Sequence, residues 1–406
     1  MLWLDWASLL VRWFHVVAGI AWIGASFYFI WLDNSLREPP EAKKKQGIKG
    51  DLWAIHGGGF YEVAKYAYGP AAMPTTLHWF KWEAYTTWLS GFALLIIVYY
   101  FGASAYLIDP AVQHWSPATA IGLGLALIFG GLALYEAACR SPLAKSPKAF
   151  ALFLVSLICV ASYLTSQWFS GRGAYIHVGA LIGTIMVANV FLNIMPNQRK
   201  MVKAVAAKAA IDPAWGAGAK LRSVHNNYLT LPVVFIMISN HYPMTYQHPQ
   251  NYLVLILMMA TAAWLRHFFN LKHLGIVRPS ILVSASAAML AIMVWVSWPA
   301  LPSQSHLPAG DSSNTHPESR QMSPVTQATV TSLINKHCVS CHSASATDDV
   351  FKVAPLGVVF DTWQDIERYA PQIHRRVAVT KDMPFMNKTE MTETERQQIA
   401  KWFNAR

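Results

Sequence analysis

Residues 338–342, Cys-Val-Ser-Cys-His, place two thiols and an imidazole at a spacing that can bind a porphyrin covalently. In a C-x-x-C-H segment both thiols can bond to the vinyl groups of one haem, and the histidine that follows lies under the iron as an axial ligand. We therefore predict a c-type haem held by Cys338, Cys341 and His342. A chance occurrence and a zinc site are the alternatives, and the residues around the motif argue against both.

A second iron ligand is expected downstream of this motif. Methionine is a common partner of histidine on such an iron, where it raises the reduction potential. The segment 381–386, Lys-Asp-Met-Pro-Phe-Met, contains two methionines. We predict Met383 as the ligand, because Pro384 stiffens the loop that presents its sulfur. Met386 is the alternative.

The residues on either side of these ligands have helical patterns. Apolar residues recur on one face of a helix predicted over 325–336. Thr392, followed three residues later by Glu395, predicts a capping box at the start of a closing helix. With a helix, C-x-x-C-H, a Met-Pro loop and a closing helix, residues 324–406 resemble a small class I cytochrome c domain.

The rest of the chain has the composition of a membrane protein. Hydrophobic residues make up 54% of the sequence and charged residues only 13%. A helix needs about 20 apolar residues to cross a bilayer. We therefore predict an all-α fold, an eight-span transmembrane helix bundle followed by the small cytochrome c domain. The spans, of which the sixth is the shortest and extends back to His225 or earlier, are 9–32, 85–101, 118–138, 149–169, 175–195, 228–240, 252–267 and 281–298.

Lysine and arginine are distributed unevenly among the connections between these spans. The connections 33–83, 139–148, 196–224 and 266–279 carry nearly all of them, whereas the three connections that alternate with these carry only Arg172. Because basic loops stay in the cytoplasm, both termini are predicted in the periplasm of a bacterium, with the spans in its inner membrane. The haem motif then lies in the compartment where c-type haem is attached and thiols meet oxidising chemistry.

Three parts of the chain follow from these patterns: a membrane domain over 1–298, a periplasmic linker over 299–323 and the haem domain over 324–406. The linker is rich in Pro, Ser, Gln and Asn, a composition typical of flexible tethers. The net charge of +11 belongs mainly to the cytoplasmic loops and does not indicate nucleic-acid binding. The first apolar run is long enough to span the bilayer, so no cleavable signal peptide is predicted.

Histidines inside the predicted spans are candidates for function. Ionisable residues are rare in spans and usually functional. His15 lies in the first span, and the small residues that follow it would let a flat ring or another helix approach closely. The span around His15 resembles the first helix of small membrane haem proteins of the protoporphyrinogen-oxidase type, in which such a histidine binds haem b. The resemblance thus implies that His15 is a haem b ligand, and the alternative is a histidine hydrogen-bonded across helices. For a b-type haem, His177 in the fifth span is the best second ligand, and His241 is the next.

A second group of polar residues lies near the cytoplasmic side. His78 and Lys81 precede the second span, and His225, Asn226 and Asn227 open the sixth. Amides suit hydrogen bonding to a flat heterocycle with lactam groups, and neighbouring aromatic side chains suit stacking on it. These stretches either line a polar substrate site or anchor the spans at the membrane surface, where Trp and Tyr are also common.

The glycine run 57–59 permits a close approach of the backbone to another group. It is not predicted to be a nucleotide-binding loop. Such a loop needs a strand before it and a helix after it, and neither is evident in the sequence.

The order of these parts resembles that of the bacterial integral-membrane urate oxidases (urate hydroxylases), which join an eight-span domain to a C-terminal cytochrome c. The resemblance covers essentially the whole chain. It rests on residues 14–26, 56–61, 78–91, 225–232, 240–243 and 338–342. It implies oxidation of urate to 5-hydroxyisourate with water as the oxygen source and without hydrogen peroxide. Electrons would pass to the cytochrome domain and on to a respiratory acceptor, such as a terminal oxidase or a soluble cytochrome.

This chemistry assigns expected roles to the polar residues near the cytoplasmic side. Adding water to a purine and removing two electrons needs a base, a polar cradle and an electron outlet. His225 or His78 would act as general base. Asn226, Asn227 and Lys81 would hold the anionic ring.

Three other functions are considered. One is a quinol-to-cytochrome electron-transfer subunit without its own organic substrate. Another is an enzyme of the protoporphyrinogen-oxidase type, whose first helix resembles the span around His15. The appended haem motif argues against that enzyme. The third is a non-redox transporter, which would leave the haem motif unexplained.

Overall fold

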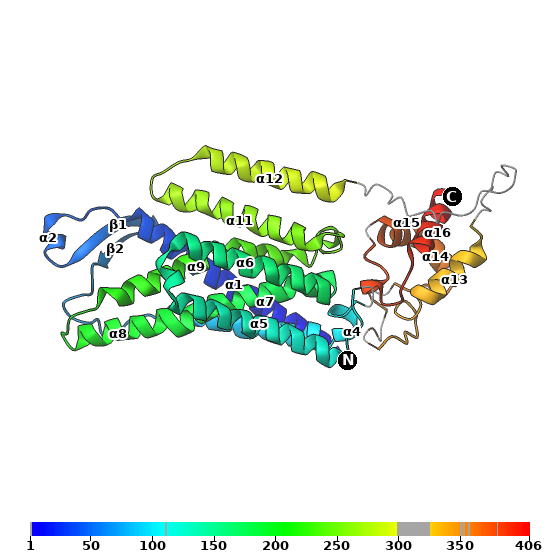
Figure 1. Ribbon diagram of the computed structural model, residues 1–406, viewed down its shortest axis with the longest axis horizontal. Helices are drawn as coiled ribbons and strands as arrows, with labels where there is room; N and C mark the ends of the chain where they lie inside the picture. Colours follow the sequence, from blue (N-terminus) through cyan, green and yellow to red (C-terminus); the bar gives the residue numbers. More distant parts are fainter. Residues whose placement is uncertain are drawn as a thin grey trace.

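The computed structural model describes residues 2–109, 112–298, 325–349, 351, 354–355, 358–379 and 381–406. The predicted linker over 299–323 lies outside these residues. Most of the described chain is helical, as expected (Figure 1).

Long helices in the first three quarters of the chain form a bundle (Figure 1). Each predicted span lies, to within one residue at its end, within one of these helices or within a helix and its continuation. The sixth span does extend back beyond His225, because its helix begins at Pro213. The bundle consists of α1 (Leu2–Ser35), α3 (Trp82–Leu94) with η1 (Leu95–Tyr100), α5 (Pro117–Arg140), α6 (Pro147–Trp168), α7 (Gly171–Ala188) with η3 (Asn189–Ile194) and α8 (Met195–Ala206), α9 (Pro213–Ser239), α11 (Asn251–His273) and α12 (Pro279–Ser297).

Local sequence explains where several of these helices begin. Ser116, Ser146 and Asp212 are N-cap residues whose side chains accept hydrogen bonds from backbone N–H groups of the first turn. Each is followed by a proline at the first helical position, where the missing N–H costs no hydrogen bond. The short helices η2 (Pro142–Lys145) and α10 (Pro243–Tyr246) lie in the connections.

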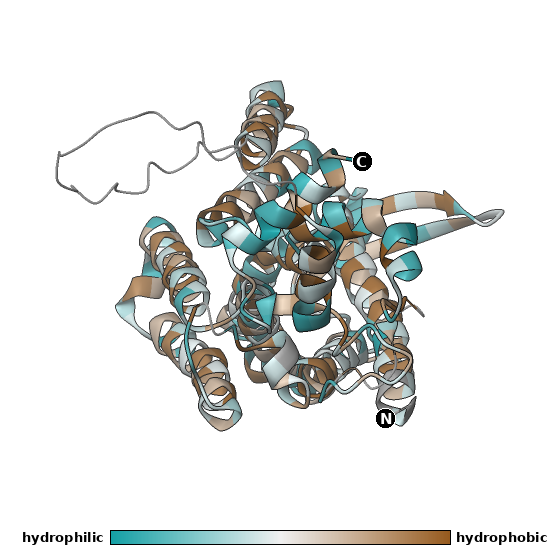
Figure 2. Cartoon of the chain, turned by 90° about the vertical axis from the view of Figure 1, so that its right-hand side faces the viewer, coloured by the Kyte–Doolittle hydropathy of each residue, from teal (hydrophilic) through white to brown (hydrophobic). Residues whose placement is uncertain are grey.

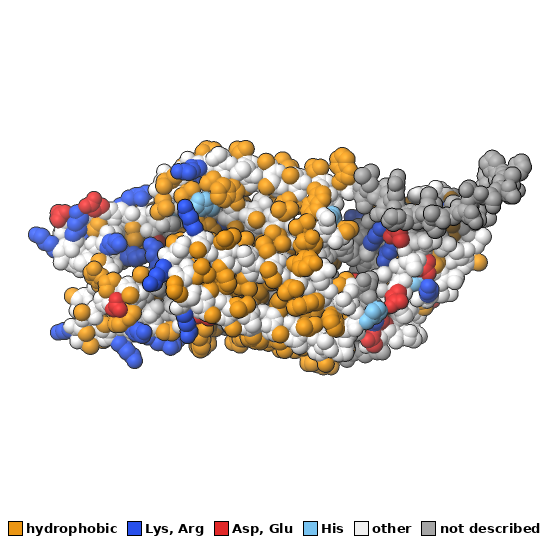
Figure 3. All heavy atoms as spheres, viewed as in Figure 1, with side chains coloured by type: hydrophobic (Ala, Val, Ile, Leu, Met, Phe, Trp, Pro, Cys, Tyr) orange, Lys and Arg blue, Asp and Glu red, His pale blue; other side chains and the backbone are white. Residues whose placement is uncertain are grey.

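Six helices of the described residues are long and apolar enough to cross a membrane, which is compatible with a multi-pass membrane protein. Apolar side chains cover the middle of the bundle, and Lys and Arg gather at the end formed by α8 and the neighbouring strands (Figure 3). The two other predicted spans, α3–η1 and α9, pack within the same bundle but are less apolar. The six apolar helices are Trp6–Ser35, Pro117–Arg140, Pro147–Trp168, Gly171–Ala206, Asn251–His273 and Pro279–Ser297. Eight spans therefore stay a prediction.

A β-hairpin departs from the all-α prediction. The strands β1 (Ile48–His56) and β2 (Gly59–Tyr66) pair in antiparallel register after the short helix α2 (Glu41–Lys44). Gly57 and Gly58 form the turn with φ of 57° and 83°, the left-handed conformation that a two-residue hairpin loop requires. The glycine run thus follows a strand that we did not predict, but a second strand and not a helix comes after it.

The described residues from 325 onward form a small helical domain. Val330 and Ile334 of α13 (Gln327–His337) pack with Ile399 and Trp402 of α16 (Glu393–Asn404) in one apolar cluster. The predicted capping box is confirmed, because the side chains of Thr392 and Glu395 bond reciprocally to each other's backbone N–H. The short helices between them are α14 (Trp363–Arg368), α15 (Ala370–His374), η5 (Arg375–Val379) and η6 (Phe385–Asn387).

The small domain lies beyond one end of the bundle, and the β-hairpin lies beyond the other (Figure 1). The short helix α4 (Ala103–Tyr106) follows η1 and contacts η6 of the small domain. Seen nearly along the bundle, the long helices carry mostly hydrophobic residues, whereas hydrophilic residues are frequent in the small domain nearest the viewer (Figure 2).

Candidate functional site

A cavity of about 1170 Å³ runs along the bundle between α1, α3–η1, α7–η3–α8 and α9. Its volume exceeds the roughly 300–1,000 Å³ of common small-molecule sites. On α1 it is lined by residues from Arg12 to Asp33, so it extends over roughly 30 Å at about 1.5 Å per helical residue. On α7, Gly179, Ala180 and Gly183 recur at helical spacing, and their small side chains leave this space open.

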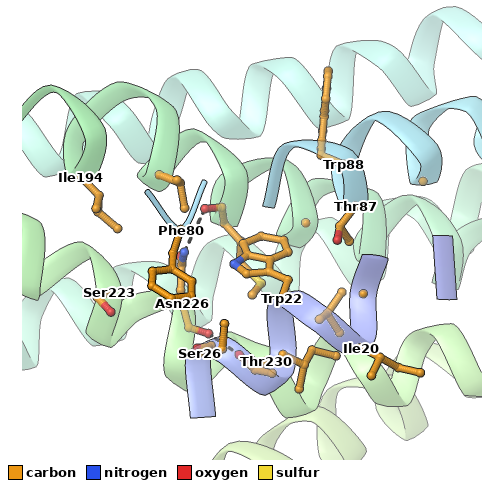
Figure 4. A pocket seen from close by; sticks show the side chains of 18 of the residues that line it. Ile20, Trp22, Ser26, Phe80, Thr87, Trp88, Ile194, Ser223, Asn226 and Thr230 are labelled. Carbon is orange, nitrogen blue, oxygen red and sulfur yellow. Dashed lines mark hydrogen bonds between the residues drawn. The ribbon is translucent and has the colours of Figure 1, made fainter. Parts of the chain in front are cut away.

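The middle of the cavity combines one large aromatic ring with a few polar groups. Trp22 of α1 projects into it, and Ser26, Asn226 and Thr230 lie together on one side of the indole (Figure 4). Asn226 and Thr230 are four residues apart on α9 and therefore share one helix face. This wall can offer hydrogen bonds to a flat ligand that packs on the indole.

The two ends of the cavity differ in charge. Arg12, Arg172 and His241 line the end nearest α4. Arg12 donates to Ser8 Oγ (3.4 Å) and Arg172 to Asn240 Oδ1 (3.0 Å), and within the described residues neither guanidinium pairs with a carboxylate. This end is therefore a cationic mouth suited to an anionic ligand.

His15 lines the cavity and has a defined tautomer. Its Nδ1 lies 3.0 Å from the carbonyl oxygen of Thr87 and 3.0 Å from Ser90 Oγ, whose own hydroxyl donates to Thr86 O at 2.6 Å. Both neighbours accept, so Nδ1 carries the proton and Nε2 keeps a free lone pair. A Cβ at Gly91 would lie 2.9 Å from the ring, so the glycine is needed for this approach.

His177 is fully buried but does not line the cavity. Its Nδ1 lies 2.8 Å from Gly173 O, and its Nε2 lies 3.4 Å from the Tyr100 hydroxyl. A Cβ at Gly124 would stand only 2.5 Å from that Nε2. His15 and His177 therefore do not face a common space for one iron, and a b-type haem stays a prediction.

Of the residues predicted to form a substrate site, His78 and Asn226 line the cavity. The His78 ring packs edge-on against Phe80 with 4.5 Å between ring centroids. Lys81 lies outside the cavity, with its ammonium 5.6 Å from the centre of the Trp82 ring.

His225 and Asn227 point away from the cavity because successive residues on α9 face different neighbours. The His225 ring stacks on Phe150 of α6 at 4.7 Å, and its Nδ1 lies 2.7 Å from the Tyr135 hydroxyl. Asn227 accepts a hydrogen bond from Arg266 Nε (2.5 Å) and donates to Asn270 (2.9 Å). The structure thus separates three adjacent residues that the sequence suggested as one site.

A buried polar cluster in the bundle was missed by sequence reasoning. Arg222 donates to both carboxylate oxygens of Glu136 (2.6 and 3.1 Å) and to Asn189 Oδ1 (2.7 Å). Asn189 in turn donates to Asn226 Oδ1 (2.8 Å), which connects the cluster to the cavity wall. Glu136 and Asn189 both lie within predicted spans, and a carboxylate in a span is the signal that would have found them.

The haem motif folds into a single turn at the end of α13. The backbone N–H groups of Cys341 and His342 donate to Cys338 O (3.1 and 2.8 Å), and both cysteines are free thiols. His342 Nδ1 donates to Val358 O at 2.9 Å, which leaves Nε2 available as an axial ligand. Burial lowers the pKa of His342 and raises that of Cys338 to about 12. The donor set fits a c-type haem.

The two candidate methionines lie in one loop. Met383 packs against the apolar cluster of the small domain. Its backbone is held by hydrogen bonds from its N–H to Arg376 O (3.1 Å) and from Arg396 Nη1 to its carbonyl (2.6 Å). Met386 is buried two residues after Pro384. Met383 stays the predicted ligand.

Among the described residues, no three His, Cys, Asp or Glu side chains form a cluster with the geometry of a metal site. A haem iron takes at most two protein ligands, and one of the two predicted here, Met383, is a thioether. The prediction of haem c therefore stands on the motif and its turn.

Comparison with protein families gave one match, and comparison with curated proteins and with solved structures gave none. The matching family is described as urate oxidase N-terminal, and its model covers residues 1–297. These residues contain all of the bundle helices and every residue that lines the cavity. The chain therefore belongs to the urate oxidase N-terminal family.

Proposed function

We propose that the chain oxidises urate to 5-hydroxyisourate in the cavity of the bundle and passes the electrons to a c-type haem in the C-terminal domain. Water supplies the oxygen atom, so no hydrogen peroxide forms. The observation that carries the proposal is the family membership of residues 1–297 together with a haem motif in the same chain.

The cavity has the chemistry that such a substrate needs. A flat anionic purine can pack on Trp22 and hydrogen-bond to Asn226. One N–H of the Asn226 amide donates to Met186 O, and its second N–H can donate to the purine. The cationic mouth at Arg12 and Arg172 attracts an anion. An apolar wall elsewhere excludes water, which strengthens each polar contact to the ring.

Balanced oxidation of urate adds one water molecule and releases two electrons and two protons. A base near the ring must accept a proton from the attacking water. We assign this role to His78, because it lines the cavity whereas His225 is packed between Phe150 and Tyr135. Asn226 positions the ring, while Lys81 and Asn227 lie outside the cavity and act, on this proposal, only through their neighbours.

The electron outlet is the C-terminal domain. Cys338 and Cys341 would hold a haem covalently, and His342 and Met383 would be its axial ligands. Such a haem supplies a one-electron acceptor. Its electrons go on to a respiratory acceptor, such as a terminal oxidase or a soluble cytochrome. We further propose that the bundle spans a bacterial inner membrane, with the N-terminus and the C-terminal domain in the periplasm.

Haem spectra of membranes that contain the full chain test this proposal. A pyridine haemochrome spectrum counts b-type and c-type haem. Urate should then reduce the c-type haem of the wild type, whereas His342→Ala should lose the normal c-type spectrum and its reduction altogether. A haem that is reduced by a quinol and not by urate would overturn the proposal and favour the electron-transfer subunit.

Two histidine variants test the assignment of the base. We expect His78→Ala to slow urate-driven haem reduction by about 100-fold, within the range that general base catalysis contributes. His225→Ala is the matched control, because its ring lies outside the cavity. Full reduction rates in both variants would exclude both histidines as the base.

A further inference from the structure

The end of the bundle meets the C-terminal domain at α4. The ring of Tyr106 contacts Phe385 with 5.0 Å between centroids and Phe351 with 6.1 Å. Beside these rings, Ser104 Oγ donates to Asp349 Oδ2 at 3.1 Å. Residues more than 240 positions apart in the sequence thus form one small aromatic contact with a polar edge.

The same tyrosine also reaches the cavity. Its ring lies 6.2 Å from that of Tyr99, and the Arg172 guanidinium lies over it at 5.4 Å. Tyr99 and Arg172 both line the cavity, and Tyr99 is held by a hydrogen bond from its hydroxyl to Asn240 Oδ1 (2.8 Å). Tyr99, Tyr106 and Phe385 therefore form a continuous row of rings from the cavity to the C-terminal domain.

The far end of this row lies in the loop that is predicted to bind the iron. Phe385 follows Met383 by two residues and precedes Met386. The Arg396 guanidinium donates to Met383 O in this loop and to Val377 O in the body of the domain, and so fixes one to the other. The C-terminal domain thus turns its methionine loop, together with Phe351, toward Tyr106.

We propose that this contact is the docking surface through which electrons leave the cavity, with the chain's own C-terminal domain as the partner. The inference rests on the proposed function. Oxidation of one urate, with the addition of one water molecule, releases two electrons and two protons. The electrons would cross the rings one at a time. A c-type haem held by Cys338, Cys341 and His342 would supply a one-electron acceptor for each of them, and an external one-electron acceptor would remove the first electron before the second transfer. Electron tunnelling weakens steeply across gaps, so a path over rings in contact is favoured over a path through solvent.

The contact is small enough to be reversible. Among the described residues, the ring contacts of Tyr106 and the Ser104–Asp349 hydrogen bond are of a kind that gives weak association on its own. The covalent connection through residues 299–324 keeps the domain near the bundle at an effective concentration on the order of millimolar. The domain can therefore dock to receive an electron and separate to pass it on.

Cross-linking of the full chain in membranes tests the docking without any turnover. The double variant Ser104→Cys with Asp349→Cys should form an internal cross-link with a short thiol reagent, detected as one linked peptide pair. Each single variant is the control and should give none. Introducing Tyr106→Ala into the double variant should lower the yield. A double variant that gives no more cross-link than the single variants would overturn the docking surface.

Stopped-flow spectroscopy tests the role in electron transfer. We expect Tyr106→Ala to slow urate-driven haem reduction by about tenfold, through loss of docking and of the ring row. Tyr106→Phe keeps the ring and should stay near the wild-type rate, as should Phe101→Ala, a matched aromatic residue that is 66% exposed. Reduction by ascorbate should be unchanged in all three variants.

The outcomes separate the two proposals. If urate reduces the haem equally fast in Tyr106→Ala and in the wild type, the proposed route is wrong while the proposed function stands. If urate fails to reduce the wild type although the cross-link forms, the function is wrong while the docking surface stands.

Discussion

The residues of the haem motif and those of the buried polar cluster in the bundle are brought together in opposite ways. Cys338, Cys341 and His342 lie within five residues, and one turn brings them together. Glu136, Asn189 and Arg222 come from α5, η3 and α9, and only the packing of the helices joins them. A ligand set confined to one turn can be read from spacing, whereas a cluster across helices depends on how each helix is rotated against its neighbours.

The two regions also differ in the free energy that is lost when an ion pair is broken. In the C-terminal domain Lys336 and Lys381, which pair with Glu395 and Glu393 of α16, are 59% and 47% exposed, so water has access to these pairs and can replace a lost partner. In the bundle the Arg222 and Glu136 side chains are 7% and 13% exposed, so a lost partner leaves a charge with little solvation. An ion pair should therefore contribute far more to stability in the bundle than in the small domain.

Removing Arg222 should have the largest effect on stability. Arg222→Ala removes both close hydrogen bonds to Glu136 and leaves Asn189 Oδ1 with only the Tyr135 hydroxyl as donor. It should destabilise the bundle by about 3–5 kcal/mol, the usual cost of breaking a buried ion pair. Arg140→Ala is the matched control. It removes a second cation from the same carboxylate, but at 3.7 Å and with a side chain that is 74% exposed, so the loss should be at most about 1 kcal/mol.

Thermal unfolding of both variants in the same detergent measures this difference. Glu136→Gln combined with Arg222→Ala should recover part of the loss, because no carboxylate is then left unpaired. Similar unfolding temperatures for Arg222→Ala and Arg140→Ala would mean that burial does not strengthen the pair.

Local signals in the sequence predicted most of the secondary structure. The haem motif, the capping box of Thr392 and Glu395, and the positions of the bundle helices all depend on residues close in sequence. The hairpin was missed because its signal is the turn formed by Gly57 and Gly58, which was read only as a glycine run. Two adjacent glycines that can both adopt positive φ were the signal that would have predicted the hairpin.

The candidate site was predicted only in part, because helix periodicity gives spacing but not orientation. His225, Asn226 and Asn227 differ by about 100° per residue around α9, so they face α6, the cavity and α11 in turn. Sequence alone could not decide which of the three faces the cavity. His15 shows the same limit, since its contact with Gly91 needs the packing of α1 against α3.

Two glycines of α5 test how closely the bundle is packed around His177. A Cβ at Gly124 would stand 2.5 Å from His177 Nε2, whereas a Cβ at Gly122 would meet nothing within 4 Å. Gly124→Ala should destabilise the bundle by about 1–3 kcal/mol through overpacking. Gly122→Ala should be neutral or stabilising by up to about 1 kcal/mol, because alanine favours the helix.

Thermal unfolding in detergent compares the two glycine variants directly. The result also bears on the haem b prediction. If His177 turned toward the cavity to bind an iron, the space above Gly124 would be vacated and Gly124→Ala would be tolerated as well as Gly122→Ala. Equal stabilities would therefore contradict the packing described and favour the ligand role.

Glu395 should show the smallest effect and a dependence on pH. Hydrogen bonds from Lys336 and from the Thr392 backbone hold its pKa well below its ordinary value of 4.5. The folded state thus binds the proton less tightly than the unfolded state. The stabilisation is complete above about pH 4.5 and is lost as the pH falls below that value.

Glu395→Gln keeps an acceptor for the Thr392 N–H and removes only the charge. Hydrogen exchange of α16 peptides in the full chain should show weaker protection in the variant at pH 7, by at most about 1 kcal/mol, because the Lys336 partner is 59% exposed. Between pH 5 and pH 3, after correction for the intrinsic exchange rate, protection should fall in the wild type and change less in the variant. A parallel fall in both would show that another carboxylate controls the acid response. A loss at pH 7 as large as that of Arg222→Ala would mean that exposure does not set the worth of an ion pair in this chain.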